Sequence, residues 1–228
     1  MKKSSKDILI RYAIATLGLI LVAIGVALSL KSNLGTAPVS CPPAVLNLRW
    51  GAISVGTFTW MMHLVFILSQ IIILGRKFKL RFLMQIPAAF VFGYLCDAAI
   101  WLCQGIVVSN YLTQMALCIA TVVITAIGIR LEIIGNAWML AGEKTTAVIS
   151  EVTEWKFSNV KIGFDIALVI LSMAFSWIVF RNIFGHDSHT VIREGTLILA
   201  ILTGLCMKLT DPVVDWLFLR FIPDDCKD

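Results

Sequence analysis

Long apolar runs separated by short polar segments make up most of the chain. A helix needs about 20 mainly apolar residues to cross the roughly 30 Å hydrocarbon core of a bilayer. Six runs reach about that length, so the pattern predicts six transmembrane helices. They cover Ile8–Leu30, Ala52–Leu74, Phe82–Cys103, Tyr111–Ile129, Ile162–Phe180 and Thr196–Leu219.

The composition points to the same class. Of the 228 residues, 59% are hydrophobic and 14% are charged, and the mean hydropathy is +0.90. Too few polar side chains remain to cover a soluble globule of this size. The net charge of +5 would suit a nucleic-acid partner, but the basic residues cluster at the ends of the apolar runs, which is typical of membrane topology. We therefore predict a polytopic protein surrounded by the lipid bilayer, with no nucleic-acid partner.

The distribution of Lys and Arg predicts the orientation in the membrane. With the N-terminus inside, fourteen basic residues fall on the cytoplasmic side and four on the outer side. Basic loops stay in the cytoplasm, so we expect a bacterial inner-membrane protein with cytoplasmic N- and C-termini. The fourteen are Lys2, Lys3, Lys6, Arg11, Arg76, Lys77, Lys79, Arg81, Arg130, Lys144, Lys156, Lys161, Arg220 and Lys227, and the four are Lys31, Arg49, Arg181 and Arg193.

The chain repeats itself at an offset of about one hundred residues. The matches are NLGTAPV at 33–39 with IIGNAWM at 133–139, Trp50 with Trp155, Arg76 with Arg181, and CDAAIWL at 96–102 with DPVVDWL at 211–217. Each copy holds three spans, so the second copy must enter the membrane from the opposite face. The sequence thus predicts an all-α fold. We expect one transmembrane domain over residues 1–228, built from two inverted repeats at about 8–104 and 111–220.

The segment KSNLGTAPVSCPP, Lys31–Pro43, interrupts the first repeat. Its three prolines lack a backbone N–H and Gly35 permits conformations closed to other residues, so a regular helix cannot continue through it. Two interpretations remain open. One is a re-entrant segment that lines a site near the midplane, and the other is an external loop or interfacial helix. The candidate site residues here are Gly35, Thr36, Pro38 and Ser40.

The loop Gly135–Lys161 is the counterpart of this segment in the second repeat. It contributes the candidate site residues Gly135, Glu143 and Thr145. We expect a helix to start near Thr145 or Thr146, because a threonine hydroxyl can cap the free amides there, and such an N-terminus favours an anion. A solvated amphipathic helix on the cytoplasmic face is the alternative.

Ionisable residues inside apolar runs are the sharpest functional signal, because a charge in lipid is costly and normally faces a partner or a cavity. Asp97, in the third run, is the strongest single candidate for a substrate or ion pathway. Lys208 and Asp211 stand three residues apart in the sixth run and are expected to pair, and Asp215 follows one turn later. Structural pairing between helices is the alternative for each of them.

Other charged residues lie nearer the ends of the runs. Asp165 and Arg11 are examples, and we expect their side chains to extend to the membrane interface. Arg130 and Glu132 follow the fourth run and are also expected at the interface.

Catalytic and metal-binding motifs are missing from the sequence. It contains no H-E-x-x-H, G-x-S-x-G, P-loop or C-x-x-C motif. Four cysteines lie inside predicted spans, where they are expected to pack as small apolar side chains. We therefore expect no enzyme activity, no catalytic residue, no metal and no cofactor.

Several segments carry a family resemblance. They are an Arg before the first span, LGTAP at 34–38, ISVGTFTW at 53–60, GRKFKLR at 75–81 and FGYLCDAAIWL at 92–102. Together they resemble the bacterial YczE/YyaS/YitT membrane proteins, and most closely the YczE-like branch without the soluble C-terminal domain of many YitT proteins. Val39 stands where the family usually has an aromatic residue. The resemblance implies a polytopic inner-membrane protein of poorly defined activity, with no established substrate.

Two classes of function remain. The first is a secondary transporter or permease for a small solute, with the two interrupted loops as gates and with proton coupling through the carboxylates. In this class Asp97→Asn is expected to abolish or uncouple transport while the protein stays folded. The second is a non-transporting membrane partner, such as a substrate-capture subunit or an accessory protein, which leaves a homodimer open. The inverted repeat favours the first class.

Overall fold

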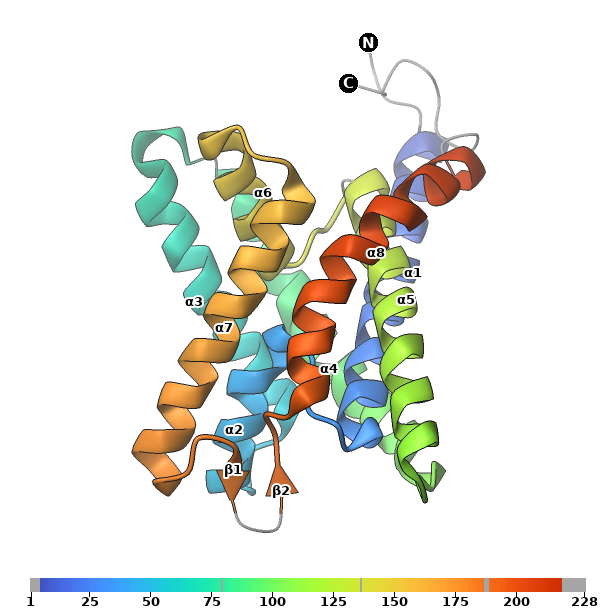
Figure 1. Ribbon diagram of the computed structural model, residues 1–228. Coiled ribbons are helices and arrows are strands. Elements are labelled where there is room, and N and C mark those ends of the chain that lie inside the picture. Colours follow the sequence, from blue (N-terminus) through green and yellow to red (C-terminus); the bar gives the residue numbers. More distant parts are fainter. Residues whose placement is uncertain (1–4, 79, 136, 187–188, 219–228) are drawn as a thin grey trace.

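The protein is a bundle of long helices in a computed structural model that describes residues 5–78, 80–135, 137–186 and 189–218 (Figure 1). Six helices are long and apolar enough to cross a membrane, which confirms the six predicted spans and makes the chain a multi-pass membrane protein. These helices are α1 (Ser5–Ser32), α3 (Val55–Leu74), α4 (Gln85–Leu102), α5 (Tyr111–Gly135), α7 (Phe157–Phe180) and α8 (Glu194–Phe218).

Helices α1, α5 and α7 are longer than the apolar pattern predicts, and the extensions of α5 and α7 carry charged side chains that are buried. Helix α5 continues past Ile129 to Gly135, and α7 starts at Phe157 instead of Ile162. The prediction stopped at charged residues, which are rare in lipid-facing helix. The extensions carry Glu132 and Lys161 into the helices, where both side chains are buried. Glu132 is therefore enclosed by the bundle and does not reach its surface.

Two short helices, α2 (Cys41–Arg49) and α6 (Ala141–Thr153), follow the two interrupted segments. After α1 and after α5 the chain turns back toward the middle of the bundle before the short helix begins (Figure 1). Helix α2 then runs toward one end of the bundle and α6 toward the opposite end. Both short helices pack between α3 and α7, so each interrupted segment lies in the interior.

Helices α1 and α5 form the closest pair in the bundle, and small residues allow their backbones to approach. A Cβ atom added at Gly18 would lie 2.7 Å from the carbonyl oxygen of Gly128. Helix α4 packs against α1 and α3, and α8 packs against α5 and α7. The apolar core at the α1–α4–α5 contact is built around Leu19, Val26, Phe92 and Ile129.

Short elements connect the helices. They are η1 (Pro38–Ser40), η2 (Gly75–Lys77), η3 (Leu80–Met84), η4 (Cys103–Gly105), β1 (Gly185–His186) and β2 (His189–Thr190). The two strands pair antiparallel at the end of the bundle near α2 (Figure 1). Large apolar side chains are exposed on the outer faces of the long helices, as contact with lipid requires; examples are Ile72, Tyr94, Ile119, Ile178 and Leu209.

Candidate functional site

A small internal cavity of about 30 Å³ lies where the two interrupted segments meet the long helices. The first segment lines it with residues 37–40 and the second with Leu140 and Glu143. The long helices contribute Val22 and Val26 from α1, Phe92 from α4, Thr121 and Thr125 from α5, Lys161 and Asp165 from α7, and Leu199 and Thr203 from α8. Val22 and Val26 lie well inside the span Ile8–Ser32, so the cavity is inside the bundle.

A buried ionic cluster forms one wall of this cavity. The Lys161 Nζ atom donates to the Asp165 Oδ1 atom at 2.7 Å and lies 3.8 Å from the Glu143 Oε1 atom. All three side chains are at least 97% buried. Lys161 and Asp165 are one turn apart on α7, while Glu143 comes from the first turn of α6. The ion pair between Glu143 and Lys161 therefore joins α6 to α7.

Glu132 adds a third carboxylate beside this cluster. Its side chain is fully buried on α5, and its Oε2 atom accepts from the Leu140 backbone N–H at 3.0 Å. Glu132 interacts electrostatically with Glu143 and Lys161. Two buried carboxylates thus lie within 4 Å of one buried ammonium group, and Glu132 is a further buried carboxyl group that interacts with it.

Several buried polar atoms at the cavity have no hydrogen-bond partner among the described residues. They are the Ser40 Oγ, Thr125 Oγ1 and Glu143 Oε2 atoms. Ser40 and Glu143 are 1% and 2% exposed. Buried polar groups are normally hydrogen-bonded, because an unpaired one costs free energy. These three oxygens therefore mark the cavity as a place where a ligand or water completes the structure.

The first interrupted segment is held by backbone contacts to the start of α8. Gly35 has φ +117°, and a Cβ atom there would lie 2.3 Å from the Thr196 Oγ1 atom. The Thr36 N–H donates to the Val191 carbonyl at 3.0 Å and to Thr196 Oγ1 at 3.1 Å. Cys41 donates to the Thr36 carbonyl, and burial raises the pKa of the Cys41 thiol to about 12. Gly35 and Thr36 therefore shape the turn, and Pro38 and Ser40 face the cavity.

The second interrupted segment is held by side chains. Gly135 ends α5 against α1, where a Cβ atom would lie 2.8 Å from the Arg11 carbonyl oxygen. Thr145 donates to the Ala141 carbonyl at 2.7 Å and accepts from the Gln70 Nε2 atom at 3.1 Å. Because the Thr145 hydroxyl bonds inside the helix, it does not cap it. Helix α6 starts at Ala141, and the expected start near Thr145 or Thr146 is wrong.

Both short helices begin at the cavity without a side-chain cap. Ser40 is the N-cap residue of α2, yet its hydroxyl makes no capping bond. Pro42 and Pro43 follow and have no backbone N–H to offer. Leu140 is the N-cap residue of α6, where Glu132 accepts from the Leu140 N–H and Glu143 stands in the first turn. Few free amides therefore remain at the start of α2, whereas at the start of α6 two carboxylates stand beside the free amides of the first turn.

Asp97 lies on α4 away from the cavity lining. Its Oδ2 atom accepts from the Ser54 hydroxyl at 2.7 Å, and its Oδ1 atom accepts from the Gly56 N–H at 2.9 Å. Ser54 is in turn the N-cap residue of α3 and accepts from the Thr57 N–H. The structure thus gives the half-buried Asp97 a visible role in fixing the start of α3 against α4.

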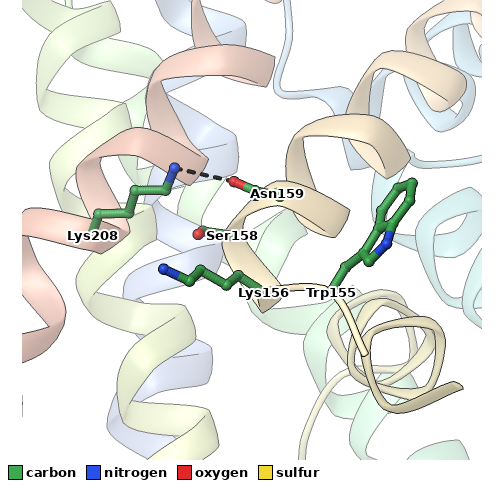
Figure 2. A pocket seen from close by; sticks show the side chains of 5 residues that line it. All are labelled: Trp155, Lys156, Ser158, Asn159 and Lys208. Carbon is green, nitrogen blue, oxygen red and sulfur yellow. Dashed lines mark hydrogen bonds between the residues drawn. The ribbon is translucent and has the colours of Figure 1, made fainter. Parts of the chain in front are cut away.

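The charged residues of α8 also lie outside the central cavity. Lys208 does not form the expected pair with Asp211 but donates to Asn159 Oδ1 at 3.1 Å. Figure 2 shows Lys208 facing Asn159 in a surface pocket of about 780 Å³, whose other labelled residues are Trp155, Lys156 and Ser158. Asp215 accepts from the Arg130 Nε atom at 2.7 Å, and the two residues join α5 to α8.

The residues that sequence reasoning missed are Lys161, Asp165 and Glu132. Asp165 was expected to reach the interface, but it is 1% exposed. The signal for the pair was present: Lys and Asp four residues apart on a helix share a face and attract each other. For Glu132 the one-dimensional pattern held no such signal, because its partner Leu140 lies beyond the helix break.

The chain is similar to a protein and to a family that are already known. The chain is 23% identical over 211 residues to "Uncharacterized protein YyaS" of Bacillus subtilis (strain 168), which covers 92% of this chain and 96% of the relative. This likeness agrees with the family resemblance found in the sequence. No solved structure matches the chain. Residues 9–212 match one family profile, and the chain therefore belongs to the family described as "Family of unknown function (DUF6198)".

Proposed function

We propose that this protein is a secondary transporter for a small solute in the bacterial inner membrane, with both termini in the cytoplasm. The observation that carries the proposal is the cavity lined by both interrupted segments, with buried oxygen atoms that lack hydrogen-bond partners among the described residues. Secondary transporters commonly place their sites where discontinuous helices expose polar groups near the midplane. Non-helical backbone at that depth is tolerated only where protein or a cavity satisfies it. No enzymatic step is part of this proposal.

The arrangement of helices supports an inverted repeat as the framework of transport. The two short helices start at Cys41 and Ala141, one hundred residues apart, and Trp50 and Trp155 follow them. The packing partners correspond: α4 with α1 and α8 with α5, then α2 with α7 and α6 with α3. Exchanging the two halves leaves this scheme of contacts unchanged. Such a framework lets one half move against the other around a fixed site.

In this mechanism the two interrupted segments act as alternate gates. Residues 37–40 would open the cavity toward the α2 end of the bundle, and Leu140 with Glu143 would open it toward the α6 end. The buried ionic cluster joins α6 to α7, so a change in its charge couples ion binding to the second gate. Proton coupling through Glu143 is the simplest form of this coupling.

The small size of the cavity favours the alternative function, a non-transporting partner protein. At about 30 Å³ it has room for a single water molecule or ion and not for an organic solute. A non-transporting partner protein, including a homodimer that serves another membrane complex, would keep this closed form. A transporter would instead pass through it as the occluded state between two open ones.

Thiol accessibility tests the proposal. Single cysteines are placed at Val39 and Thr203, which line the cavity, in a variant without native cysteines. Sealed vesicles of both orientations are treated with a membrane-impermeant thiol reagent. We expect labelling from both faces, because the cavity opens to each in turn. Ala52→Cys and Glu154→Cys, in exposed turns at opposite ends, are controls that should react from one face each. Reaction of Val39→Cys and Thr203→Cys from the same single face, or from neither, would favour the partner protein.

A further inference from the structure

We propose that the central cavity binds one alkali metal cation, and that this cation competes with a proton for Glu143. The inference deepens the proposed function and rests on it for the role of the ion in transport. Binding itself is measured separately from transport. The argument uses the charge around the cavity, the helix ends that face it, and the oxygen atoms that line it.

The three carboxylates of the cluster outnumber its one ammonium group by two, so the charge balance calls for protons, a cation or one of each. Lys161 is the only cation among the described residues of the cluster, and it lies against Asp165 at 2.7 Å and Glu143 at 3.8 Å. Glu132 stands nearby as a third carboxylate. Burying an uncompensated charge is costly, so a group in this position either takes up a proton or holds a cation.

The helix ends argue against an anion in the same place. A helix N-terminus attracts anions through its free amides and its dipole. At α2 the number of free amides is reduced by Pro42 and Pro43. At α6 the Glu132 carboxylate already accepts from the Leu140 N–H, and Glu143 adds a second carboxylate in the first turn. The negative charge at the start of α6 therefore disfavours an anion in the cavity.

The available ligands are hard oxygen atoms, which suit alkali metal ions. The Glu143 Oε2, Ser40 Oγ and Thr125 Oγ1 atoms have no hydrogen-bond partner among the described residues. The first two come from α6 and from the end of the first segment, and the third comes from α5, where it also packs against Gly25 of α1. The 30 Å³ cavity matches one dehydrated ion or one water molecule.

The groups around Glu143 set the direction of the pH dependence. Helix α7 presents Lys161 and Asp165, α5 presents Glu132, and α3 presents Gln70 with the buried His63 on the same helix. The cation needs Glu143 in its ionised form, whereas a proton on Glu143 removes the charge that attracts it. Affinity for the cation should therefore rise with pH.

Thermal unfolding of the purified full chain in detergent tests the inference. The probes are LiCl, NaCl and KCl against choline chloride at equal ionic strength, at pH 8.5 and pH 6. We expect at least one alkali cation to raise the midpoint by about 5 °C at a hundredfold excess over its Kd, with a smaller rise at pH 6. Glu143→Gln, which resembles the protonated form, should lose the rise. Glu151→Gln, the same change at an exposed site on α6, should keep it.

Ser40→Ala provides a second variant in case Glu143→Gln does not fold. Loss of the hydroxyl ligand should weaken the cation response at least tenfold in concentration. No cation-specific rise in the native protein, or an unchanged rise in Ser40→Ala or Glu143→Gln, would overturn the inference. The two proposals can also fail separately. If the cation response persists but the cavity cysteines are labelled from one face only, the transport proposal is wrong and the ion site is still supported.

Discussion

The two interrupted segments reach the same cavity by different chemistry. The first, residues 33–40, carries no buried charge and depends on Gly35, on prolines, and on hydrogen bonds to the start of α8. The second, residues 135–140 with the first turn of α6, depends on the Glu132, Glu143 and Lys161 side chains. The similar backbone path is thus stabilised by conformation on one side and by ion pairing on the other.

This difference indicates a division of roles between the halves. Charges can change with ion binding, whereas a glycine turn keeps its shape. In the proposed ion site, the second segment is therefore the part that would respond to an ion, and the first would provide a fixed wall with one hydroxyl. If so, substitutions in the second segment should lower the free energy of unfolding by leaving charges unpaired. Substitutions in the first segment should lower it by straining the backbone.

The largest effect is expected at Lys161. Lys161→Met leaves Asp165 and Glu143 buried without their cation, and removal of one partner of a buried pair costs about 3–5 kcal/mol. The free energy of unfolding, measured in mixed micelles with a denaturing detergent, should fall by that amount. Lys156→Met, at an exposed site just before α7, should change it by less than about 0.5 kcal/mol.

The double variant Lys161→Met with Asp165→Asn sharpens this test. Removing both charges of the pair should recover part of the lost stability, because the uncompensated carboxylate is the source of the cost. If the single variant is as stable as Lys156→Met, the second segment is not held by charge.

The next largest effect is expected at Gly35 in the first segment. Gly35→Ala forces a Cβ atom to within 2.3 Å of Thr196 Oγ1 at a φ of +117°. Backbone strain and overpacking together should cost about 3 kcal/mol. Gly142→Ala, in α6, meets nothing closer than 3.5 Å and should be neutral or slightly stabilising by helix propensity. Equal losses at the two glycines would contradict the proposed contrast.

The contrast also shows what the sequence could and could not reveal. The six spans and the two interruptions were predictable, because apolar length and the Gly and Pro residues are local signals. Among the candidate residues, Pro38, Ser40 and Glu143 do line one cavity. The ionic cluster was not predicted, because Glu132 and Lys161 looked like ends of apolar runs. Only the turn of the chain back into the bundle brings these charges together.

A smaller effect is expected at Asp97, whose neighbours belong to α3 and not to the cavity. Asp97→Asn keeps one acceptor oxygen for Ser54 or Gly56, so the loss of unfolding free energy should be about 1 kcal/mol. The response to alkali cations should be unchanged. If the variant keeps full stability but loses the cation response or transport, Asp97 is part of a substrate or ion pathway, as the sequence suggests.

The smallest effect is expected at Asp215, an acidic residue near the end of α8. Its contact with Arg130 joins α5 to α8, but the two side chains are 24% and 27% exposed, and such pairs contribute about 0.2–1 kcal/mol. Asp215→Asn should therefore lower the unfolding free energy by about 0.5 kcal/mol, and the difference should disappear in concentrated choline chloride, which screens exposed charges. The Lys161→Met loss should survive the same salt, because that pair is out of reach of solvent. Equal salt sensitivity at both sites would mean that the central cluster is open to water, and the contrast between an enclosed charged site and a partly solvated pair would fail.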